Sequence, residues 1–513
     1  MRWTASQIAT TLGVAAPAGP PAGLSPDAEL VGVSIDSRTV ARGELFVAIH
    51  GPRHDGHDHL AGALDRGAVA LVVAREKWAS LPAEIQRRAF AVDDTLAALH
   101  RLAARACQIW RAQKPGRRIG AVAGSVGKTT TKEILAALVG ARLRVLKTQG
   151  NLNNEYGLPL TLLQVEDDDE AIVLEMGMSH RGELARLAQI ARPDVGVITC
   201  VAVEHLEFFS SIEEIALAER ELIENLPWPQ ATAVLNADDP RVAQFDQVAH
   251  GPILWFGLDA IALDSTRKTN AAAGPHGRPA EFRAENIEER GIDGSAFDFV
   301  SPAGRTRLEL PLIGRHNVVN AVAALAAATT WGIGAADAQK VFPTLTPADK
   351  RGEVVRFAEG FTVINDTYNS SPTALNALAG LLAATPGYRR KILAAGEMRE
   401  LGPSSPELHR ECGAGVAQLK KIDWIVGVTG DAAEFVNSAI QAGHAQDHAK
   451  SFANSEEAGK FFAGFIQSGD LLLLKGSRGV KMEKILEAID AAHPRASSAA
   501  ANSRKTIESQ GPR

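Results

Sequence analysis

A glycine-rich turn in the first half of the chain has the residue types needed to bind phosphate groups. It follows the apolar run Ile119–Ala123 and precedes a stretch with apolar residues on one helical face. Glycines let backbone N–H groups converge on phosphate oxygens, and the start of a helix adds its positive dipole end. We expect Lys128 to reach the β- and γ-phosphates and the Thr129 hydroxyl to bind Mg²⁺. The residues of the turn are Gly124, Ser125, Val126, Gly127, Lys128, Thr129 and Thr130.

The turn is shorter than the usual G-x-x-x-x-G-K-[ST] phosphate loop. Val122 stands at the first glycine position of that motif, which leaves G-x-x-G-K-T-T. A Gly-Lys-Thr triplet also arises by chance in a chain of 513 residues. A triplet placed between a strand and an amphipathic helix is much rarer, so the pattern favours a nucleoside triphosphate site.

Two further side chains are predicted at the same place. Glu175 ends the apolar run Ala171–Leu174, and His205 follows the next apolar run. Acidic residues often merely end a strand, and an isolated histidine is usually structural. Because the carboxyl ends of parallel strands share one sheet edge, the pairing with the lysine turn favours Glu175 as a second magnesium ligand and His205 as a further site residue.

The elements that must position these residues alternate along the chain. Short β-branched or Leu-rich runs are separated by Ala/Leu-rich helical stretches, which predicts an α/β fold with mostly parallel sheets covered by helices. The expected strands are Ile119–Ala123, Ala171–Leu174, Val195–Thr199, Ala233–Leu235, Val363–Ile364, Ile392–Ala395, Ile425–Val428 and Leu471–Leu474.

Length and local composition predict three domains and a tail. We expect an N-terminal domain over 1–112, a central nucleotide-binding domain over 113–346 and a C-terminal domain over 347–492. The polar stretch from about 264 to 306 predicts an irregular or antiparallel excursion. Residues 493–513 lack apolar periodicity and are expected to be disordered.

Composition excludes several classes of function. Lys and Arg (54) are fewer than Asp and Glu (60), and the net charge of −6 disfavours nucleic acid or an anionic membrane as a partner. Three scattered cysteines argue against a disulfide framework. The first residues lack a signal-peptide core, and Ala321–Ala336 is interrupted by threonines and glycines. We expect a cytoplasmic, monomeric enzyme that acts on small molecules.

With these features noted, the chain resembles the Mur ligases, a family of ATP-dependent amide-bond-forming enzymes of peptidoglycan synthesis. The resemblance spans about 480 residues of this sequence. It implies a central P-loop-type ATPase domain, an N-terminal UDP-substrate domain and a Rossmann-like C-terminal domain, with ATP and Mg²⁺ as cofactors. Besides the lysine turn, it is carried by Thr148–Leu163, Glu175–Leu184, Glu204–Phe209, Asn236–Pro240, Gly314–Ala321 and Lys475–Glu483.

A narrower resemblance points to the members that join D-alanyl-D-alanine to UDP-N-acetylmuramoyl-tripeptide. Asp36–His57, Ile364–Leu375 and Ala395–Gly402 carry it, and the D-N-P-R signature of the diaminopimelate-adding members is missing. It implies that the peptide carboxylate attacks the γ-phosphate of ATP. The amine of the dipeptide then attacks the acyl phosphate.

The resemblance also implies roles for individual residues. Nucleotide contacts are expected from Asn317, Arg351 and Asp366, and contacts near the phosphates from Asn153 and Asn154. The UDP-sugar end is expected at Ser37, Arg38 and His57, and the dipeptide at Tyr368, Asn369 and Pro372. His205 is expected to assist a second magnesium ion.

One position departs from the family pattern. Many members carry a carbamylated lysine in the helix after the HLEFF block, but this chain has Glu219 there, with Arg220 beside it. Arginine stays protonated and cannot form a carbamate. Glu219 is an anion with a shorter reach, by about 4 Å. Two interpretations stay open: Glu219 replaces the carbamate as a metal ligand, or it is a solvent-facing charge.

Three other functions compete with this hypothesis. A nucleotide switch or kinase could use the same turn, but it would lack a role for the last domain. A silent binding protein would not need Lys128, Thr129, Glu175 and His205 together. A Mur ligase that adds a single amino acid is the nearest competitor, and a substrate panel separates it.

Overall fold

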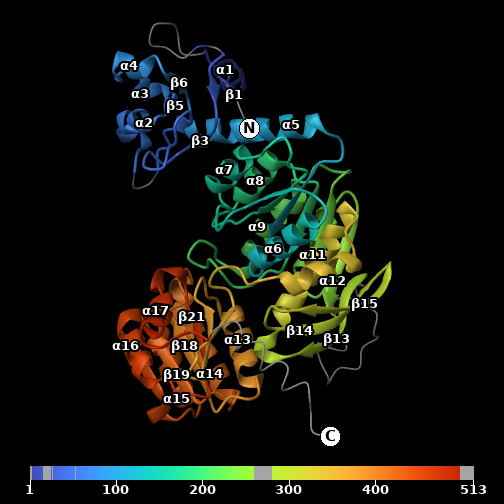
Figure 1. Cartoon of the computed structure of the whole chain (residues 1–513), viewed down its shortest axis with the longest axis vertical. Coiled ribbons are helices and arrows are strands. Elements are labelled where there is room, and N and C mark those ends of the chain that lie inside the picture. Colours follow the sequence, from blue (N-terminus) through green and yellow to red (C-terminus); the bar gives the residue numbers. More distant parts are fainter. Residues whose placement is uncertain (1–2, 16–24, 26, 52–53, 259–279, 497–513) are drawn as a thin grey trace.

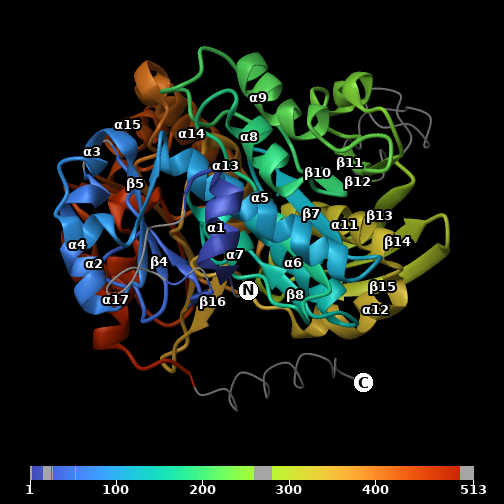
Figure 2. The ribbon, with the colours of Figure 1, turned by 90° about the horizontal axis from the view of Figure 1, so that it is seen from above.

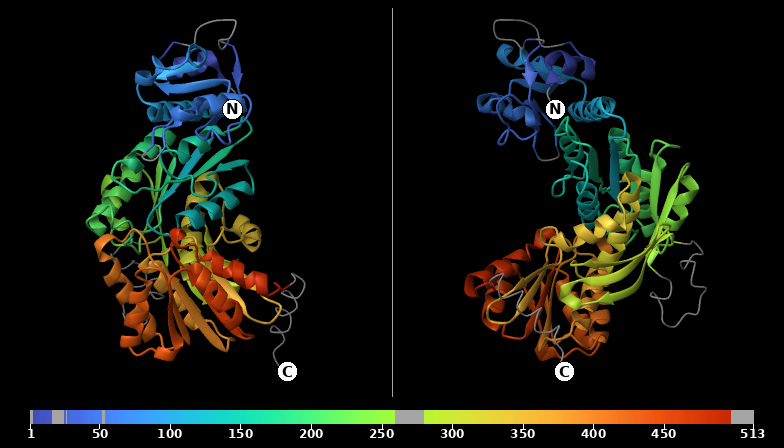
Figure 3. Two further views of the ribbon diagram at one scale, coloured as in Figure 1. Left: turned by 90° about the vertical axis from the view of Figure 1, so that its left-hand side faces the viewer. Right: turned by 45° about the vertical axis from the view of Figure 1, so that its right-hand side comes forward.

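In a computed structural model, the chain folds into three α/β domains joined end to end (Figure 1). The structure describes residues 3–15, 25, 27–51, 54–258 and 280–496. The N-terminal and C-terminal domains lie at opposite ends of the central domain and on the same side of it (Figures 1 and 3). Seen along the long axis, the two outer domains overlap beside the central sheet (Figure 2).

The N-terminal domain is built on a four-stranded parallel sheet in the order β3-β4-β5-β6. A short antiparallel pair, β1 (Trp3–Thr4) with β2 (Glu29–Leu30), lies beside helix α1 (Ala5–Leu12). The strands are β3 (Val33–Ser34), β4 (Leu45–Val47), β5 (Ala70–Ala74) and β6 (Ala89–Val92), with helices α2 (Leu60–Arg66), α3 (Arg75–Trp78) and α4 (Ala83–Gln86).

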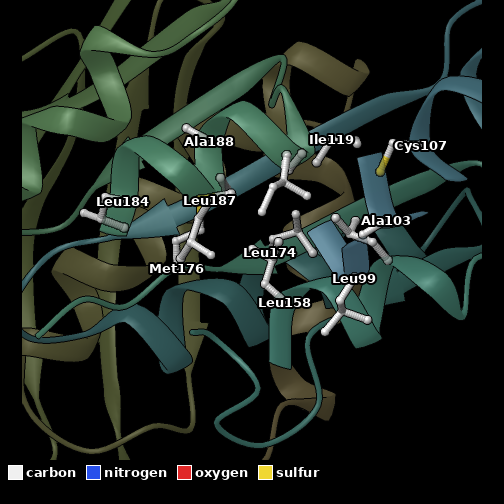
Figure 4. Close-up of a cluster of buried hydrophobic side chains, with 14 of the residues drawn as sticks. Leu99, Ala103, Cys107, Ile119, Leu158, Leu174, Met176, Leu184, Leu187 and Ala188 are labelled. Carbon is white, nitrogen blue, oxygen red and sulfur yellow. The ribbon is translucent and has the colours of Figure 1, made fainter. Parts of the chain in front are cut away.

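Helix α5 (Thr95–Gln113) connects this domain to the next. Asp94 caps its start by accepting from the N–H groups of Leu96 and Ala97. Its buried face packs on α7 (Gly157–Leu163) and α8 (Glu183–Ala191) of the central domain. Figure 4 shows Leu99, Ala103 and Cys107 of this helix among central-domain side chains. The shared core therefore fixes α5 on the central domain.

The central domain has a nine-stranded sheet in the order β15-β14-β13-β12-β11-β10-β7-β9-β8. Strands β7 to β13 run parallel to one another in the sheet, whereas β14 is antiparallel to both β13 and β15. They are β7 (Arg118–Ala123), β8 (Val145–Lys147), β9 (Ala171–Glu175), β10 (Val195–Ile198), β11 (Thr232–Asn236), β12 (Ile253–Leu258), β13 (Phe282–Glu289), β14 (Ser295–Ser301) and β15 (Gly304–Leu310).

Side chains alternate between the two faces of this sheet, as the two-residue period of a strand requires. Ile119 and Ala121 of β7 pack with α5, α7, α8 and α9 (Ile212–Glu224), whereas Val122 packs with α6 (Lys128–Gly140) and α11 (Arg315–Ala328). Helix α12 (Ala335–Val341) follows α11. Both faces are covered, which is why these strands are apolar throughout.

The C-terminal domain has a six-stranded sheet in the order β16-β17-β21-β18-β19-β20, in which only β16 is antiparallel to its neighbour. Helices α13 to α15 cover one face, and α16 and α17 cover the other. The strands are β16 (Glu353–Arg356), β17 (Thr362–Asp366), β18 (Arg390–Gly396), β19 (Trp424–Val428), β20 (Ala449–Phe452) and β21 (Asp470–Lys475). The helices are α13 (Pro372–Ala384), α14 (Ser405–Gln418), α15 (Ala432–Gln441), α16 (Ser455–Phe465) and α17 (Glu483–Ala492).

The predicted α/β class and all eight predicted strands are confirmed, with small changes at the strand ends. The described part of the polar excursion, from 280 onward, forms the antiparallel strands β13 to β15. Of the predicted tail, residues 493–496 lie against the C-terminal domain. Ala496 N–H donates to Arg356 O, and Arg495 forms an isolated antiparallel β-bridge with Phe357. Residues 497–513 lie outside the described residues.

Over the described ranges, no helix is both long enough and apolar enough to cross a membrane.

Candidate active site

The predicted phosphate-binding turn contains two glycines that no other residue could replace without strain. Gly124 has φ +121° and Gly127 has φ +94°, both in the region that favours glycine. A Cβ at Gly124 would collide with the Thr199 side chain, and one at Gly127 would collide with Asn320. Thr199 Oγ1 also donates to Val126 O at 2.7 Å. The turn is therefore fixed by β10 on one side and by α11 on the other.

Lys128 lies at the first position of α6 with its ammonium group folded into the turn. Nζ donates to the carbonyls of Gly124 (2.5 Å) and Ser125 (3.1 Å), and it lies 3.6 Å from Glu204 Oε1. Burial lowers the pKa of Lys128, but Glu204, Glu219 and other nearby anions outweigh this effect and leave the pKa raised. The side chain is therefore a largely buried cation, held where phosphates are predicted to bind.

Glu175 presents a free carboxylate oxygen beside this turn. Parallel pairing sets Glu175 of β9 opposite Val122 of β7. The Glu175 backbone N–H donates to Thr148 Oγ1, and Asn153 Nδ2 donates to Oε1 at 2.8 Å. The second oxygen, Oε2, is buried and has no hydrogen-bond partner. A buried carboxylate oxygen without a donor suits a cation, so the site fits the predicted magnesium ligand.

Glu219 is buried against the turn. Glu219 is only 2% exposed, and its Oε2 accepts a hydrogen bond from Gly124 N–H at 2.8 Å. Burial raises the pKa of Glu219 to about 7, although Lys128 nearby acts in the opposite direction. The interpretation of Glu219 as a solvent-facing charge is therefore wrong, because α9 packs this face onto the sheet.

His205 lies in the loop that follows β10, in a left-handed backbone conformation (φ +53°). Nδ1 lies 2.5 Å from Glu400 Oε2 of the C-terminal domain, and Nε2 lies 3.7 Å from Glu204 Oε2. Burial lowers the pKa of His205, but the Glu400 and Glu204 carboxylates together outweigh this effect, so the net pKa lies above its ordinary value.

Among the described residues, no three His, Cys, Asp or Glu side chains are already grouped to hold a metal ion. Mg²⁺ in nucleotide sites usually keeps water and phosphate oxygens as ligands and takes only one or two carboxylates. The single free oxygen of Glu175 and the buried Thr129 hydroxyl match that smaller demand.

A cavity of about 460 Å³ extends from the turn to the C-terminal domain. The wall of the cavity that the C-terminal domain forms is its far wall. There the Arg351 guanidinium lies 4.1 Å from the centre of the Tyr368 ring, and Asp366 forms an ion pair with Lys475. Of the predicted residues, those that line it are Ser125, Val126, Gly127, Lys128, Thr129, Thr130, Asn153, Asn154, Glu175, His205, Arg351, Asp366, Tyr368 and Asn369.

Four predicted residues of this region do not line the cavity, and two of them, Gly124 and Glu219, are buried beside the turn and hydrogen-bonded to each other. Asn317 does not line the cavity; its Nδ2 donates to Ile313 O, and its Oδ1 accepts from Asn320 Nδ2. Pro372 is the first residue of α13, and its neighbours Ser371 and Thr373 line the cavity instead. In both motifs, neighbouring residues line the cavity, whereas Asn317 and Pro372 themselves do not.

Several lining residues were not predicted: Glu204, His316, Asn320, Glu400, Lys475 and Arg478. His316 and Asn320 are four residues apart on α11, and this spacing puts them on one face. The helical spacing in GRHNVVNA could have indicated them. Glu400 lies in the Ala395–Gly402 block, but no local signal indicates that it reaches the site, because its contact with His205 is made between domains.

The predicted N-terminal residues do not reach this cavity. Arg38 is exposed and donates to both carboxylate oxygens of Asp36, and Ser37 lies beside it. His57 is buried, with Nδ1 2.6 Å from Asp55 Oδ1 and Nε2 accepting from Ala74 N–H at 2.9 Å. Both ring nitrogens of His57 are therefore engaged within the domain.

Replacing His57 with phenylalanine is expected to destabilise the N-terminal domain. The change leaves buried polar groups of Asp55 and Ala74 without their partner, which costs about 2 kcal/mol. Chemical unfolding of the full chain measures the loss, and Arg38→Ala is the control because its pair is exposed. Wild-type stability in His57→Phe would contradict the structural role.

Comparison with known proteins agrees with this architecture. Sequence profiles match in chain order: "Mur ligase family, catalytic domain" over 29–106, "Mur ligase middle domain" over 122–328 and "Mur ligase, glutamate ligase domain" over 350–478. UDP-N-acetylmuramoyl-tripeptide–D-alanyl-D-alanine ligase from Bacillus subtilis (strain 168) is 33% identical over 89% of this chain and 92% of its own. The chain belongs to the Mur ligase family.

Solved Mur ligase structures share the whole fold. MurF from Acinetobacter baumannii superposes with a TM-score of 0.80 at 28% identity, over 95% of this chain and 99% of that one. MurF ligase from Thermotoga maritima in complex with ADP gives a TM-score of 0.72 at 28% identity, over 90% and 97%. The similarity therefore covers all three domains of this Mur ligase.

Proposed function

We propose that this Mur ligase uses ATP to join D-alanyl-D-alanine to UDP-N-acetylmuramoyl-tripeptide. The observation that carries the proposal is the interdomain cavity, in which the phosphate turn, Lys128 and the free oxygen of Glu175 face the C-terminal domain. The full-length similarity to ligases named for this reaction supports the choice of substrates.

The reaction forms and breaks bonds in two steps. A carboxylate oxygen of the tripeptide attacks the γ-phosphorus, the bond to the β–γ bridging oxygen breaks, and ADP leaves. The dipeptide amine then attacks the acyl carbon, the bond to the phosphate oxygen breaks, and inorganic phosphate leaves with the amine having lost a proton. Lys128 neutralises the charge that builds on the transferred group, and the turn N–H groups hold the phosphates.

Magnesium would be held by Thr129 and Glu175, with His205 and Glu219 as candidates for a second ion. When bound, the ion neutralises phosphate charge. The chain itself orients Glu175 through Thr148 and Asn153, and it keeps Glu219 out of water. Adenine and ribose contacts are proposed for the far wall of the cavity, at Arg351 and Asp366, and for the face of α11.

The other substrates are proposed on either side of this centre. Ser37 and Arg38 of the N-terminal domain would hold the UDP-sugar end, and Asn153 and Asn154 would border the reacting carboxylate. The dipeptide would enter near Tyr368 and Asn369, next to the start of α13. Closure of the outer domains would exclude water from the acyl phosphate.

A substrate panel tests the proposal. Phosphate release should require ATP, UDP-N-acetylmuramoyl-tripeptide and D-alanyl-D-alanine together, and the product mass should equal the two joined substrates minus one water. Efficient release with a single amino acid would instead assign the chain to another Mur ligase activity. Efficient use of GTP in place of ATP would contradict the nucleotide assignment.

A further inference from the structure

Two strained loops from different domains meet at His205. His205 has φ +53° and Glu400 has φ +64°, a backbone conformation that non-glycine residues rarely adopt. The central-domain loop follows β10, and the other loop joins β18 to α14. Strain of this kind persists only where the surrounding structure holds it, and it concentrates at functional positions.

The contact between these loops is made by both backbone and side chains. Glu207 N–H donates to Glu400 O at 3.1 Å, and Glu400 Oε2 lies 2.5 Å from His205 Nδ1. Gly402 comes close to Leu206 O, where a Cβ would be 3.0 Å away. Together these contacts hold the imidazole ring against the C-terminal domain, with Nδ1 turned toward Glu400.

The loop that carries Glu400 is itself rigidly anchored. Glu397 N–H donates to Val428 O (3.1 Å), Met398 N–H to the buried His409 Nε2 (3.0 Å), and Arg399 N–H to Ser477 Oγ (2.9 Å). Three successive backbone groups are therefore fixed to the C-terminal sheet and its flanking elements. A site side chain is held accurately only when its support is locked in this way.

The opposite edge of the His205 ring faces the phosphate turn. Nε2 lies 3.7 Å from Glu204, whose other oxygen lies 3.6 Å from Lys128 Nζ. In histidines that bind metals, the second ring N–H commonly donates a hydrogen bond to a carboxylate, which fixes the orientation and tautomer of the ring. In this chain the carboxylate comes from the C-terminal domain.

We propose that Glu400 is a positioning residue that orients His205 for the metal-phosphate centre and makes that orientation depend on the docked C-terminal domain. The proposal rests on the metal role of His205 in the proposed function. The Glu400 side chain is half exposed, so its ion pair with His205 contributes little to the stability of the fold. Loss of Glu400 should therefore affect the orientation of the His205 ring more than the stability of the protein.

The test measures Mn²⁺ binding by electron paramagnetic resonance, with the full chain and a non-hydrolysable ATP analogue. Glu400→Ala should weaken Mn²⁺ binding by about tenfold or more, the usual effect of losing a carboxylate behind a metal-binding histidine. Glu400→Gln keeps a hydrogen-bond acceptor for Nδ1 and should retain most of the affinity. The matched control is Glu434→Gln, which removes a carboxylate paired with Arg410 within the C-terminal domain.

A double variant separates orientation from general charge. If Glu400 acts through His205, adding Glu400→Ala to His205→Ala should cause no further loss. Wild-type Mn²⁺ affinity in Glu400→Ala or in His205→Ala, or additive losses in the double variant, would overturn the proposal. The Mn²⁺-binding assay contains neither the UDP-tripeptide nor the dipeptide. A failed ligation assay would therefore count against the proposed function without affecting the Mn²⁺-binding result.

Discussion

Lys128→Ala is expected to reduce the ligation rate by about 10³-fold, the scale seen when a charge-stabilising group is removed from a transition state. Lys128 is the cation folded into the phosphate turn, and Glu175, Glu204 and Glu219 surround it. Without it, a polyanionic nucleotide would have to bind beside these carboxylates without the cation that is folded into the turn. Phosphate release under saturating substrates measures the loss.

The control for this variant is Lys340→Ala, which removes an exposed lysine from α12, outside the cavity lining. It should keep wild-type activity. Thermal unfolding of both variants shows whether the fold is retained. Ligation by Lys128→Ala within threefold of wild type would contradict the phosphate site.

Glu219 variants are expected to separate two roles of the buried carboxylate. Glu219→Ala removes both the anion and the acceptor for Gly124 N–H, whereas Glu219→Gln keeps an acceptor and removes the charge. If Glu219 takes the place of a carbamylated lysine as an anion for the second magnesium, both variants should lose about 10²-fold in rate. Both should also need more Mg²⁺ for half-maximal rate.

The same pair of variants can reject this role. Full activity in Glu219→Gln with loss in Glu219→Ala would reduce Glu219 to a support for the turn. Added bicarbonate should leave the wild-type rate unchanged, because no lysine at this position needs carbon dioxide. A bicarbonate-dependent wild type would show that another residue supplies a carbamate.

The arrangement of the domains connects these predictions. Lys128 lines the cavity from the central domain, with Glu219 buried behind the turn, and Arg351, Asp366 and Glu400 line the same cavity from the C-terminal domain. A centre divided in this way depends on how the domains close, so substitutions on one side can change the affinity on the other.

Contiguous sequence was sufficient to determine the phosphate turn. Its glycines, Lys128 and Thr129 lie between one strand and one helix, so their chemistry depends on local backbone geometry that residue types specify. The apolar runs also predicted the strands, because a strand buried on both faces is apolar at every position. The position of Glu175 beside the turn was also predictable, because parallel strands end at a common edge of the sheet.

Only the tertiary structure decided the contacts that span the chain. Gly124 and Glu219 are 95 positions apart, and whether Glu219 faces the turn or solvent depends on the rotation of α9 against the sheet. His57 is engaged by Asp55 and Ala74, and His205 meets a carboxylate from another domain. These pairings depend on how packed elements rotate and dock, and a single sequence contains no local pattern that encodes such long-range geometry.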